Sequence, residues 1–491
     1  MTAKSFLSSA VLLIVSVLCV SLAHPGVFCA SGIAFFGWIS YVPLFLLIKR
    51  SSIKLSALWG ALYGFCKFFS IMFWMFSYNK PALVGVGFLM VVETVPVFLL
   101  CALVQKRLPR WSWLLMPLIM LLFEFLRTMG DLGFSYGIIG YSQWKVLPLV
   151  RSARIFGVWG VSFAIMLCGS VAANVIGAVD FSSRPVGTIE RRQILCLFGF
   201  VAVLLAGGFV PLLSKATAEK TLDVVLIQPN SDPWKEGVEA YWDELQSLIA
   251  ITDRALDEHP EAQLVVWGET AFVPDVVRHY TQKKDAARYM LSRHLLNYIE
   301  EKKRAFVLGN NHQETVENNG REEVQNYNSA LFFEPGKNVF PPRPVVYNKM
   351  RLVPFTEMIP YPRLLTAFAK IFSLDSHFWS AGEKVTLFEL EGIRFCTPIC
   401  FEDTFSSGIR DMCMTGAELI VNLSNDSWAH SLASQNQHLS MAVFRCAENH
   451  VPAVRCTASG QTCFIDAQGR VTAELKPFTE GYLFGRISVG K

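Results

Sequence analysis

The hydrophobic positions of this 491-residue chain are concentrated in its first part. Seven apolar stretches there are each long enough, or nearly long enough, to cross a bilayer as a helix. They are Phe6–Ala23, Ile33–Ile48, Leu55–Phe76, Leu83–Leu103, Trp111–Leu126, Ala153–Val179 and Ile194–Leu213. Lys4 and Ser21-Leu22-Ala23 also fit a signal peptide over the first stretch, but the six further stretches favour a membrane span. The pattern predicts an α-helical membrane domain of about seven spans over residues 1–214.

After residue 214 the pattern changes to short apolar runs that alternate with charge-rich helical stretches. Runs typical of buried strands are Val224–Gln228, Leu264–Trp267, Ala305–Leu308, Ser329–Phe333, Val345–Tyr347, Arg394–Ile399, Leu419–Leu423 and Ala453–Thr457. Helical spacing occupies Trp234–His259, Asp285–Lys303 and Gln437–His450. Strands that first alternate with helices and later come in hairpin-like pairs predict a layered α/β domain with a mixed sheet over residues 215–491.

The basic residues between the apolar stretches predict how the chain crosses the membrane. They follow the second, fourth and sixth stretches, at Lys49, Arg50, Lys54, Lys106, Arg107, Arg110, Arg184, Arg191 and Arg192. The connections after the first and third stretches carry only Lys80, whereas the one after the fifth is an exception, with Arg127, Lys145 and Arg151. Because Lys and Arg are enriched on the inner side, we expect the amino terminus inside and residues 215–491 outside.

Composition narrows the range of functions. The net charge of +4 is modest and comes with no basic stripe interleaved with aromatic residues, so we expect no nucleic-acid partner. The twelve cysteines form no CxxC pair, and no Cys/His spacing indicates zinc. The chain also has no Walker loop and no dinucleotide-binding glycine fingerprint. We therefore expect no metal ion and no nucleotide cofactor.

Three reactive residues follow apolar runs of the second part. Glu269 comes after LVVW, Lys349 after VVYN and Cys400 after RFCTPI. Ligands of α/β folds bind at the carboxyl ends of strands, so these side chains are expected to meet there. A carboxylate can take the proton of the thiol, an ammonium can stabilise an oxyanion, and a thiolate can attack a carbonyl. The sequence therefore predicts acyl transfer through Cys400. Cys396 is expected to lie within the preceding strand and to be dispensable.

The motifs around these residues resemble a known family. The chain carries LVVWGETAF at 264–272, YNKMRLVPFTEMIP at 347–360, CTPICFEDTF at 396–405 and FEFLRTMGDLGFSYGIIGYSQ at 123–143. Together they resemble the carbon–nitrogen hydrolase (nitrilase) superfamily and, within it, the apolipoprotein N-acyltransferase family, whose members place a multi-span membrane domain before a nitrilase-like domain. The resemblance implies an α-β-β-α sandwich. It also implies that Glu269 is the general base, Lys349 the oxyanion-stabilising residue and Cys400 the nucleophile.

The resemblance implies roles for further residues. Glu357 resembles a glutamate that supports the lysine, and Glu402 resembles another acid that the family requires. From the residues alone, Glu402 could instead offset Arg410 or cap a helix. The segment Asn422–Trp428 is similar to a loop that closes the active site, although its polar residues also fit an ordinary turn. We expect substrate contacts from Trp267, Phe401, Asn425 and Trp428.

The resemblance implies a two-step reaction with two lipid substrates. Cys400 would take an acyl chain from a phospholipid as a thioester and pass it to the amino group of a diacylglyceryl-modified amino-terminal cysteine of a lipoprotein. This places the protein in the bacterial cytoplasmic membrane, with its catalytic domain on the periplasmic or outer side. The apolar segment Pro360–Gly382 could dip into the lipid interface and admit acyl chains. It could equally form a helix packed on its own domain.

Two rival functions remain open from the sequence. One is a membrane-tethered amidase or nitrilase that acts on a small amide, against which the size of the membrane part argues. The other is an inactive transporter or scaffold with a nitrilase-like domain. Against this second rival, we predict that the spans carry no chain of buried acids and bases suited to ion coupling. Glu124 and Arg127 could neutralise each other at the membrane interface or contact a lipid headgroup.

The sequence departs from the family pattern at three places. Gly268 stands where a proline is common before the glutamate, and Ala458-Ser459 stands where amides are common. The sequence also ends at Lys491, after a segment to which family members commonly add a final span.

Overall fold

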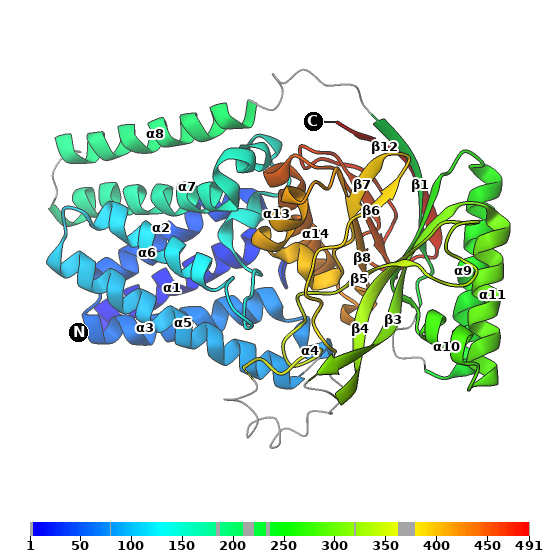
Figure 1. Cartoon of the computed structure of the whole chain (residues 1–491). Coiled ribbons are helices and arrows are strands. Elements are labelled where there is room, and N and C mark those ends of the chain that lie inside the picture. The colour runs from blue at the N-terminus through cyan, green and yellow to red at the C-terminus, as the bar shows by residue number, and fades with distance from the viewer. Residues whose placement is uncertain are drawn as a thin grey trace. The chain divides into compact units, whose positions relative to one another are not determined.

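The computed structural model describes residues 3–78, 80–182, 187–209, 220–231, 236–318, 321–361 and 379–490. The chain divides into two compact units (Figure 1). Unit 1 comprises Met1–Ser214 and Ala429–Glu448, and unit 2 comprises Lys215–Trp428 and Asn449–Lys491. Most of the predicted arm Pro360–Gly382 lies outside the described residues.

Unit 1 is helical. Its elements are α1 (Ala3–Ala23), α2 (Ala34–Arg50), α3 (Ile53–Met72), α4 (Met75–Tyr78), α5 (Lys80–Arg107), α6 (Ser112–Leu126), the 3-10 helix η1 (Ile139–Gln143), α7 (Leu147–Ser182), α8 (Thr188–Phe209) and α14 (Leu432–Asn449). Over its described residues each of the seven apolar stretches is helical, with a break between α3 and α4 in the third. Five helices of this described part are long and apolar enough to cross a membrane. α2 and α6 are shorter, at 17 and 15 residues. A multi-span membrane domain is thus confirmed.

Helix α14 belongs to unit 1 although it lies far along the sequence. Its Gln437 side-chain amide donates to the backbone oxygens of Pro25 and Ile71, at 2.6 and 2.8 Å, and accepts from the Trp74 indole at 3.1 Å. Nearby, the Asn436 side chain donates to a further backbone oxygen at 2.8 Å. Buried amides of this kind satisfy carbonyl groups that have no water to bond to.

The residues described in unit 2 form two six-stranded sheets. The first has the order β12-β1-β2-β3-β4-β5 and the second β11-β10-β9-β8-β7-β6. The strands of the first are β1 (Lys220–Gln228), β2 (Leu264–Phe272), β3 (Ala305–Asn318), β4 (Arg321–Phe333), β5 (Val345–Asn348) and β12 (Gly481–Val489). Those of the second are β6 (Phe388–Leu390), β7 (Ile393–Cys396), β8 (Leu419–Ser424), β9 (Ala453–Thr457), β10 (Cys463–Ile465) and β11 (Val471–Glu474). The strand pattern alone predicted one mixed sheet, which is wrong in number, whereas the nitrilase-like fold implied by the resemblance is confirmed.

Each sheet has a parallel centre and antiparallel edges. β1, β2 and β3 run parallel, as do β7, β8 and β9, and the flanking strands pair antiparallel. The two sheets approach each other at their centres, where Cys456 Sγ lies 3.3 Å from the Ile227 oxygen and 3.2 Å from the Val266 oxygen. The central strands are therefore buried on both faces, which explains their continuous apolar runs.

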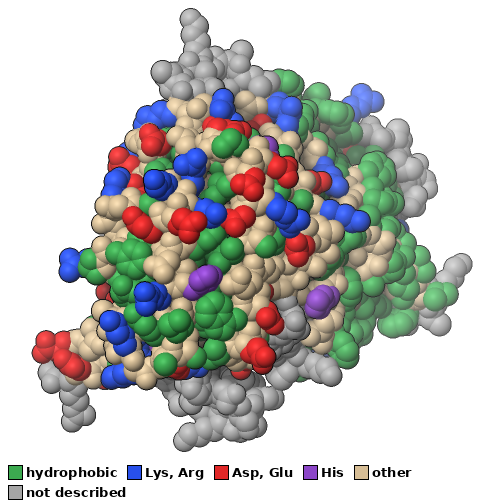
Figure 2. All heavy atoms as spheres, turned by 90° about the vertical axis from the view of Figure 1, so that its right-hand side faces the viewer, with side chains coloured by type: hydrophobic (Ala, Val, Ile, Leu, Met, Phe, Trp, Pro, Cys, Tyr) green, Lys and Arg blue, Asp and Glu red, His purple; other side chains and the backbone are tan. Residues whose placement is uncertain are grey.

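Helices α9 (Val238–Glu258), α10 (Val276–Gln282) and α11 (Ala286–Lys302) lie beside the first sheet (Figure 1). α9 turns Leu245, Leu248, Ile251 and Ala255 inward at helical spacing, into a core shared with β1, β2 and β3. The face on the other side of these helices carries acidic and basic side chains intermixed (Figure 2). This helical layer thus shields one face of the first sheet from water. The described part of unit 2 also contains the short helices η3 (Cys400–Thr404), α13 (Ser406–Met414) and η4 (Ser427–Ala429).

Candidate active site

Glu269 lies at a bulge in β2. We expected the strand to end at Trp267, but β2 continues to Phe272, so this prediction was wrong. The pairing with β3 shifts register between Trp267 and Phe272, and Thr270 has a φ of 52°. A Cβ on Gly309 of β3 would lie 2.7 Å from the Glu269 Cα, so only glycine leaves room for this bulge. The bulge turns the Glu269 carboxylate out of the regular ladder.

Lys349 follows β5 directly, as predicted, and its ammonium group bridges two carboxylates. Nζ lies 2.8 Å from Glu357 Oε1 and 3.2 Å from Glu269 Oε1, and the Lys349 side chain is 1% exposed. Asn328 of β4 donates its amide to the same two oxygens, at 3.2 and 2.8 Å. The Lys349 backbone nitrogen also donates to the Asn328 oxygen at 2.9 Å. The antiparallel pairing of β4 with β5 thus fixes the lysine between the two glutamates.

Cys400 opens η3, four residues after β7 ends at Cys396. Its φ is 49°, in the left-handed region that non-glycine residues rarely adopt. A nucleophile held in such a turn is presented away from the strand that precedes it. Cys396 is the last residue of β7 and is buried, which confirms its predicted place within the strand. The two thiols therefore occupy different environments, although they are close in sequence.

The charges around Cys400 define its resting state. Burial, with the Glu269 carboxylate as the next cause, raises the pKa of the Cys400 thiol well above its ordinary value, and Lys349 opposes this rise. Burial tends to lower the pKa of Lys349, but Glu269, Glu357 and Cys400 raise it well above its ordinary value. The lysine is therefore an ammonium and the cysteine a neutral thiol at neutral pH. The thiol needs a base, and Glu269 is the carboxylate that shifts its pKa most.

Glu402 connects the turn of Cys400 to the segment after Lys349. Its Oε1 accepts hydrogen bonds from the Tyr347 hydroxyl and the Met350 nitrogen, both at 2.8 Å, and from the Arg351 nitrogen at 3.1 Å. Its Oε2 accepts from the Ile399 nitrogen at 2.7 Å. This bond caps the start of η3, so the capping role considered from the sequence applies to Oε2 alone. The three bonds to Oε1 instead tie the nucleophile turn to the lysine segment.

Burial raises the pKa of Glu402, and this predicts a dependence of stability on pH. The folded state holds the proton to higher pH than the unfolded state, whose value is near 4.5. The contribution of Glu402 to stability is therefore present below that pH and is lost as pH rises through the raised pKa. We expect the Tm of the detergent-solubilised protein to fall over this window more steeply in wild type than in Glu402→Gln. Parallel Tm profiles would contradict this assignment.

The predicted substrate contacts occupy different places. The Asn425 backbone nitrogen donates to Glu269 Oε2 at 2.9 Å, so this loop orients the base. Phe401 is buried and packs edge-on against Phe405. Trp267 is fully buried in the core beneath the helices, where its indole donates to Thr252 at 3.0 Å. We therefore do not include it among the proposed substrate contacts. The side chain of Trp428 lies outside the described part of the chain.

Sequence reasoning missed two residues of this site. Asn328 joins the Glu269 and Glu357 carboxylates, and Tyr347 holds Glu402. Asn328 directly precedes the expected strand Ser329–Phe333 and lies within β4, and Tyr347 ends the expected strand Val345–Tyr347 and opens the motif at 347–360. A polar residue on a buried strand position is the signal that could have found them. Among the described residues, no group of three or more His, Cys, Asp and Glu side chains could hold a metal ion.

A charged cavity of about 60 Å³ lies within unit 1. Lys67 of α3, Glu93 of α5, and Glu124 and Arg127 at the end of α6 line it. Glu124 is buried, accepts from the Ile139 nitrogen at 3.3 Å and lies 3.9 Å from Lys67 Nζ. Glu124 is buried but Lys67, Glu93 and Arg127 are only partly buried, and the expectation that the spans carry no chain of buried acids and bases suited to ion coupling stays a prediction. The Arg127 guanidinium lies 3.3 Å from a methionine sulfur.

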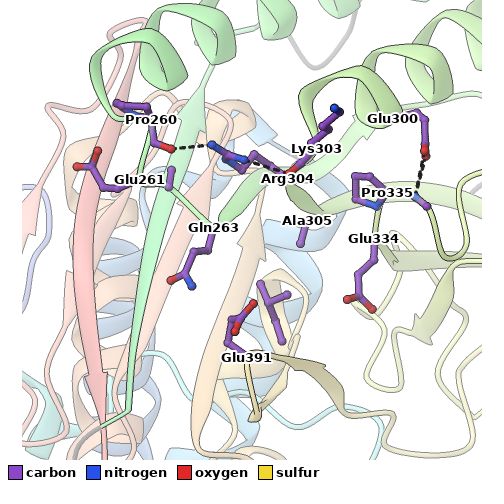
Figure 3. Close-up of a pocket in the computed structure, with 13 residues that line it drawn as sticks. Pro260, Glu261, Gln263, Glu300, Lys303, Arg304, Ala305, Glu334, Pro335 and Glu391 are labelled. Atoms are coloured by element: carbon purple, nitrogen blue, oxygen red, sulfur yellow. Dashed lines mark hydrogen bonds between the residues drawn. The ribbon is translucent and has the colours of Figure 1, made fainter.

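A larger hollow, of about 650 Å³, lies at the other end of the first sheet (Figure 3). It is lined by residues that precede β2 and β3 and by the turn after β4, among them Gln263, Arg304 and Glu334. The Arg304 guanidinium there donates to the Pro260 oxygen at 2.7 Å (Figure 3). The hollow lies at the amino-terminal end of β2, whereas Glu269 lies toward the carboxyl-terminal end of the same strand. The hollow is therefore separate from the site.

The chain is similar to known proteins along most of its length. Residues 224–491 match the carbon-nitrogen hydrolase family, and residues 16–171 match the apolipoprotein N-acyltransferase N-terminal domain. Apolipoprotein N-acyltransferase 1 of Treponema denticola is 37% identical over 486 residues, covering 96% of this chain and 88% of the relative. That of Treponema pallidum is 37% identical over 504 residues, covering 99% and 91%. An amidase of the nitrilase superfamily from Nesterenkonia aligns with 56% of this chain and 93% of its own, at 15% identity and a TM-score of 0.39.

Proposed function

Because the chain belongs to the apolipoprotein N-acyltransferase family of carbon–nitrogen hydrolases, we propose that Cys400 carries a fatty acyl chain, as a thioester, from a phospholipid to a lipoprotein. The observation that carries this mechanism is the arrangement at the site. A buried ammonium, Lys349, bridges Glu269 and Glu357 beside a cysteine held at a positive φ. These parts suffice for acyl transfer, which needs a base, a nucleophile and a cation at the oxyanion.

The first half-reaction forms the acyl-enzyme. Glu269 takes the proton from Cys400 Sγ, and the thiolate attacks the ester carbonyl of the phospholipid. The Lys349 ammonium stabilises the oxyanion of the tetrahedral intermediate. As the intermediate collapses, Glu269 returns the proton to the leaving oxygen, which departs as the hydroxyl of a lysophospholipid. Glu357 and Asn328 hold the lysine and the base in register for this transfer.

The second half-reaction transfers the acyl chain to an amine. The amino group of the diacylglyceryl-modified terminal cysteine of the lipoprotein attacks the thioester carbonyl, and Glu269 takes a proton from the attacking nitrogen. The carbon–sulfur bond breaks, an amide forms, and the proton held by Glu269 returns to Cys400. The Asn425 backbone nitrogen keeps one carboxylate oxygen of Glu269 in place during both steps. The cycle needs no metal ion or nucleotide, because the ester already carries the activation.

The membrane unit supplies the setting for lipid substrates. Charged groups buried among membrane helices are costly unless they are paired or bind a ligand. We place a phospholipid headgroup contact at Arg127 and Glu124, which line the charged cavity of unit 1. The apolar segment Pro360–Gly382 is proposed as the path by which acyl chains enter, on the strength of its sequence alone. Phe401, next to the nucleophile, is proposed as an apolar contact of the bound chain.

The distribution of Lys and Arg supports a location. Basic residues follow the second, fourth and sixth apolar stretches, at the ends of α2 and α5 and in the first turns of α8. Under the positive-inside tendency, this distribution supports our proposal that the amino terminus lies in the cytoplasm and the catalytic residues on the outer side of a bacterial cytoplasmic membrane. A cysteine residue introduced at an exposed position of the α9–α11 layer should then react with a membrane-impermeant thiol reagent in intact spheroplasts.

The proposed function is tested by trapping the acyl-enzyme. Purified protein is incubated with a phospholipid that carries a labelled acyl chain, without an acceptor. We expect label on the Cys400 peptide, removable by hydroxylamine, and then transferred to a diacylglyceryl-cysteine peptide when this is added. Hydrolysis of small amides without any lipid-derived adduct would contradict the proposal and favour a tethered amidase.

A further inference from the structure

A buried arginine in unit 2 joins two carboxylates that belong to separate segments. Arg455, in the middle of β9, is 1% exposed, and Asp403 and Asp426 are each 3% exposed. Nη1 pairs with Asp403 and donates to Asn422 Oδ1 at 2.8 Å, while Nη2 donates to Asp426 Oδ2 at 2.9 Å and to Ser424 at 3.4 Å. The guanidinium therefore uses its fork to bind both acids at once.

The position of Arg455 on β9 is unusual for its charge. Its strand neighbours Val454 and Cys456 are fully buried, and the Cys456 sulfur faces the first sheet. Because side chains alternate along a strand, Arg455 points to the other face of β9. Its parallel register partner is Asn422 of β8, which shares that face. Burying a charge here is costly, so two carboxylates and an amide are needed to hold it.

Asp403 belongs to the turn that carries the nucleophile. It lies three residues after Cys400 within η3, and it is buried. The turn must hold Cys400 at a positive φ, and Glu402 ties only one side of it to the lysine segment. The ion pair between Asp403 and Arg455 anchors the same turn to β9. The nucleophile turn is thus held from two directions.

Asp426 belongs to the loop that orients the base. Its neighbour Asn425 donates its backbone nitrogen to Glu269 Oε2 at 2.9 Å. The Ser424 hydroxyl donates to Asp426 Oδ1 at 3.1 Å, which adds a second restraint on the same loop. A shift of this loop would therefore move the hydrogen bond that fixes the Glu269 carboxylate. Arg455 restrains this loop through Asp426.

We propose that Arg455 is a positioning residue that sets the nucleophile and the general base relative to each other, through Asp403 on one side and Asp426 on the other. This inference rests on the proposed function of Cys400 and Glu269. Arg455 also balances the charge of Asp426, which is among the carboxylates that face Cys400. Among the described residues, Glu269, Lys349, Asp426 and Glu357 are charged groups that act on the thiol.

The test measures the geometry and the charge separately. Acylation of Cys400 by labelled phospholipid reports geometry, and the pH profile of Cys400 alkylation by iodoacetamide, read by peptide mass, reports charge. In Arg455→Met we expect acylation to slow roughly 100-fold, as for a small misplacement of reacting groups. Its alkylation midpoint should move to higher pH, since two carboxylates lose their cation. In Asp426→Asn the midpoint should move to lower pH. Arg455→Lys should keep the midpoint but acylate slowly.

The matched control is Arg486→Met. Arg486 also binds an aspartate through two nitrogens, at 2.7 and 2.8 Å from Asp223, but at the exposed edge between β12 and β1. We expect its acylation rate and alkylation midpoint to match wild type. All rates are divided by the fraction of protein that is folded. If Arg455→Met does not fold, the inference is tested with Arg455→Lys and Asp426→Asn instead.

Folded Arg455→Met or Arg455→Lys proteins that acylate at the wild-type rate would overturn the inference, as would an Asp426→Asn alkylation midpoint equal to that of Arg486→Met. Failure of the proposed function looks different. In that case wild type takes no acyl group from phospholipid, while the opposed shifts of the alkylation midpoints in Arg455→Met and Asp426→Asn remain.

Discussion

Replacing Cys400 by alanine is expected to reduce acyl transfer by roughly 10⁴-fold or more, because no other group can form the covalent intermediate. The variant should also lose the hydroxylamine-sensitive acyl adduct completely. The fold should survive, since the change removes one sulfur atom and alanine is nearly as small as cysteine. Thermal unfolding would check the fold, and transfer of a labelled acyl chain to a diacylglyceryl-cysteine peptide would measure activity.

Cys396→Ala is the matched control for this substitution. Cys396 lies four residues earlier, at the end of β7, and its sulfur lies 3.9 Å from the Leu419 oxygen. Both changes remove one buried sulfur from the same part of the second sheet, so both should lower Tm to a similar small extent. Only Cys400→Ala should lose activity. A folded Cys396→Ala protein without activity would count against Cys400 as the nucleophile.

Replacing Lys349 by methionine should have the second largest effect, on activity and stability together. Loss of an oxyanion donor is expected to slow acylation by about 10²–10³-fold. The change also leaves Glu269 and Glu357 buried without their cation, which is expected to lower the free energy of unfolding by about 3–5 kcal/mol. Acyl-enzyme formation under single-turnover conditions and chemical denaturation in detergent would measure the two effects.

Two further variants separate the two roles of Lys349. Adding Glu357→Gln to Lys349→Met removes one of the two unpaired charges and should recover part of the stability but none of the activity. Lys337→Met breaks an exposed lysine–glutamate pair of the same unit, with Lys337 70% exposed and its Nζ 2.5 Å from Glu334, and should change neither. A folded Lys349→Met protein that acylates Cys400 at near the wild-type rate would remove the lysine from the mechanism.

The fold shows where local patterns are sufficient and where they are not. The apolar stretches predicted the helices of the membrane unit because span length and apolarity are local properties. The number of sheets was not local. The strands of the two sheets have similar apolar sequences, since the central strands of both are buried on two faces. Which strands pair into which sheet is decided only in the folded chain, where β1 and β2 pack against β8 and β9. Similarly, Leu264–Trp267 predicted a strand, but the bulge at Glu269 depends on Gly309 of the neighbouring strand.

The sequence by itself determined the parts of the chemistry: a thiol, an ammonium and a carboxylate, each after an apolar run, in a chain whose first part is built for a membrane. These can be read from short segments because residue type and strand position carry the reactivity. Tertiary structure decided how the parts are held. Lys349 and Glu269 lie 80 residues apart in sequence, Arg455 and Asp403 lie 52 apart, and their contacts follow from strand register and burial. Such pairings depend on distances in space, which no short segment contains.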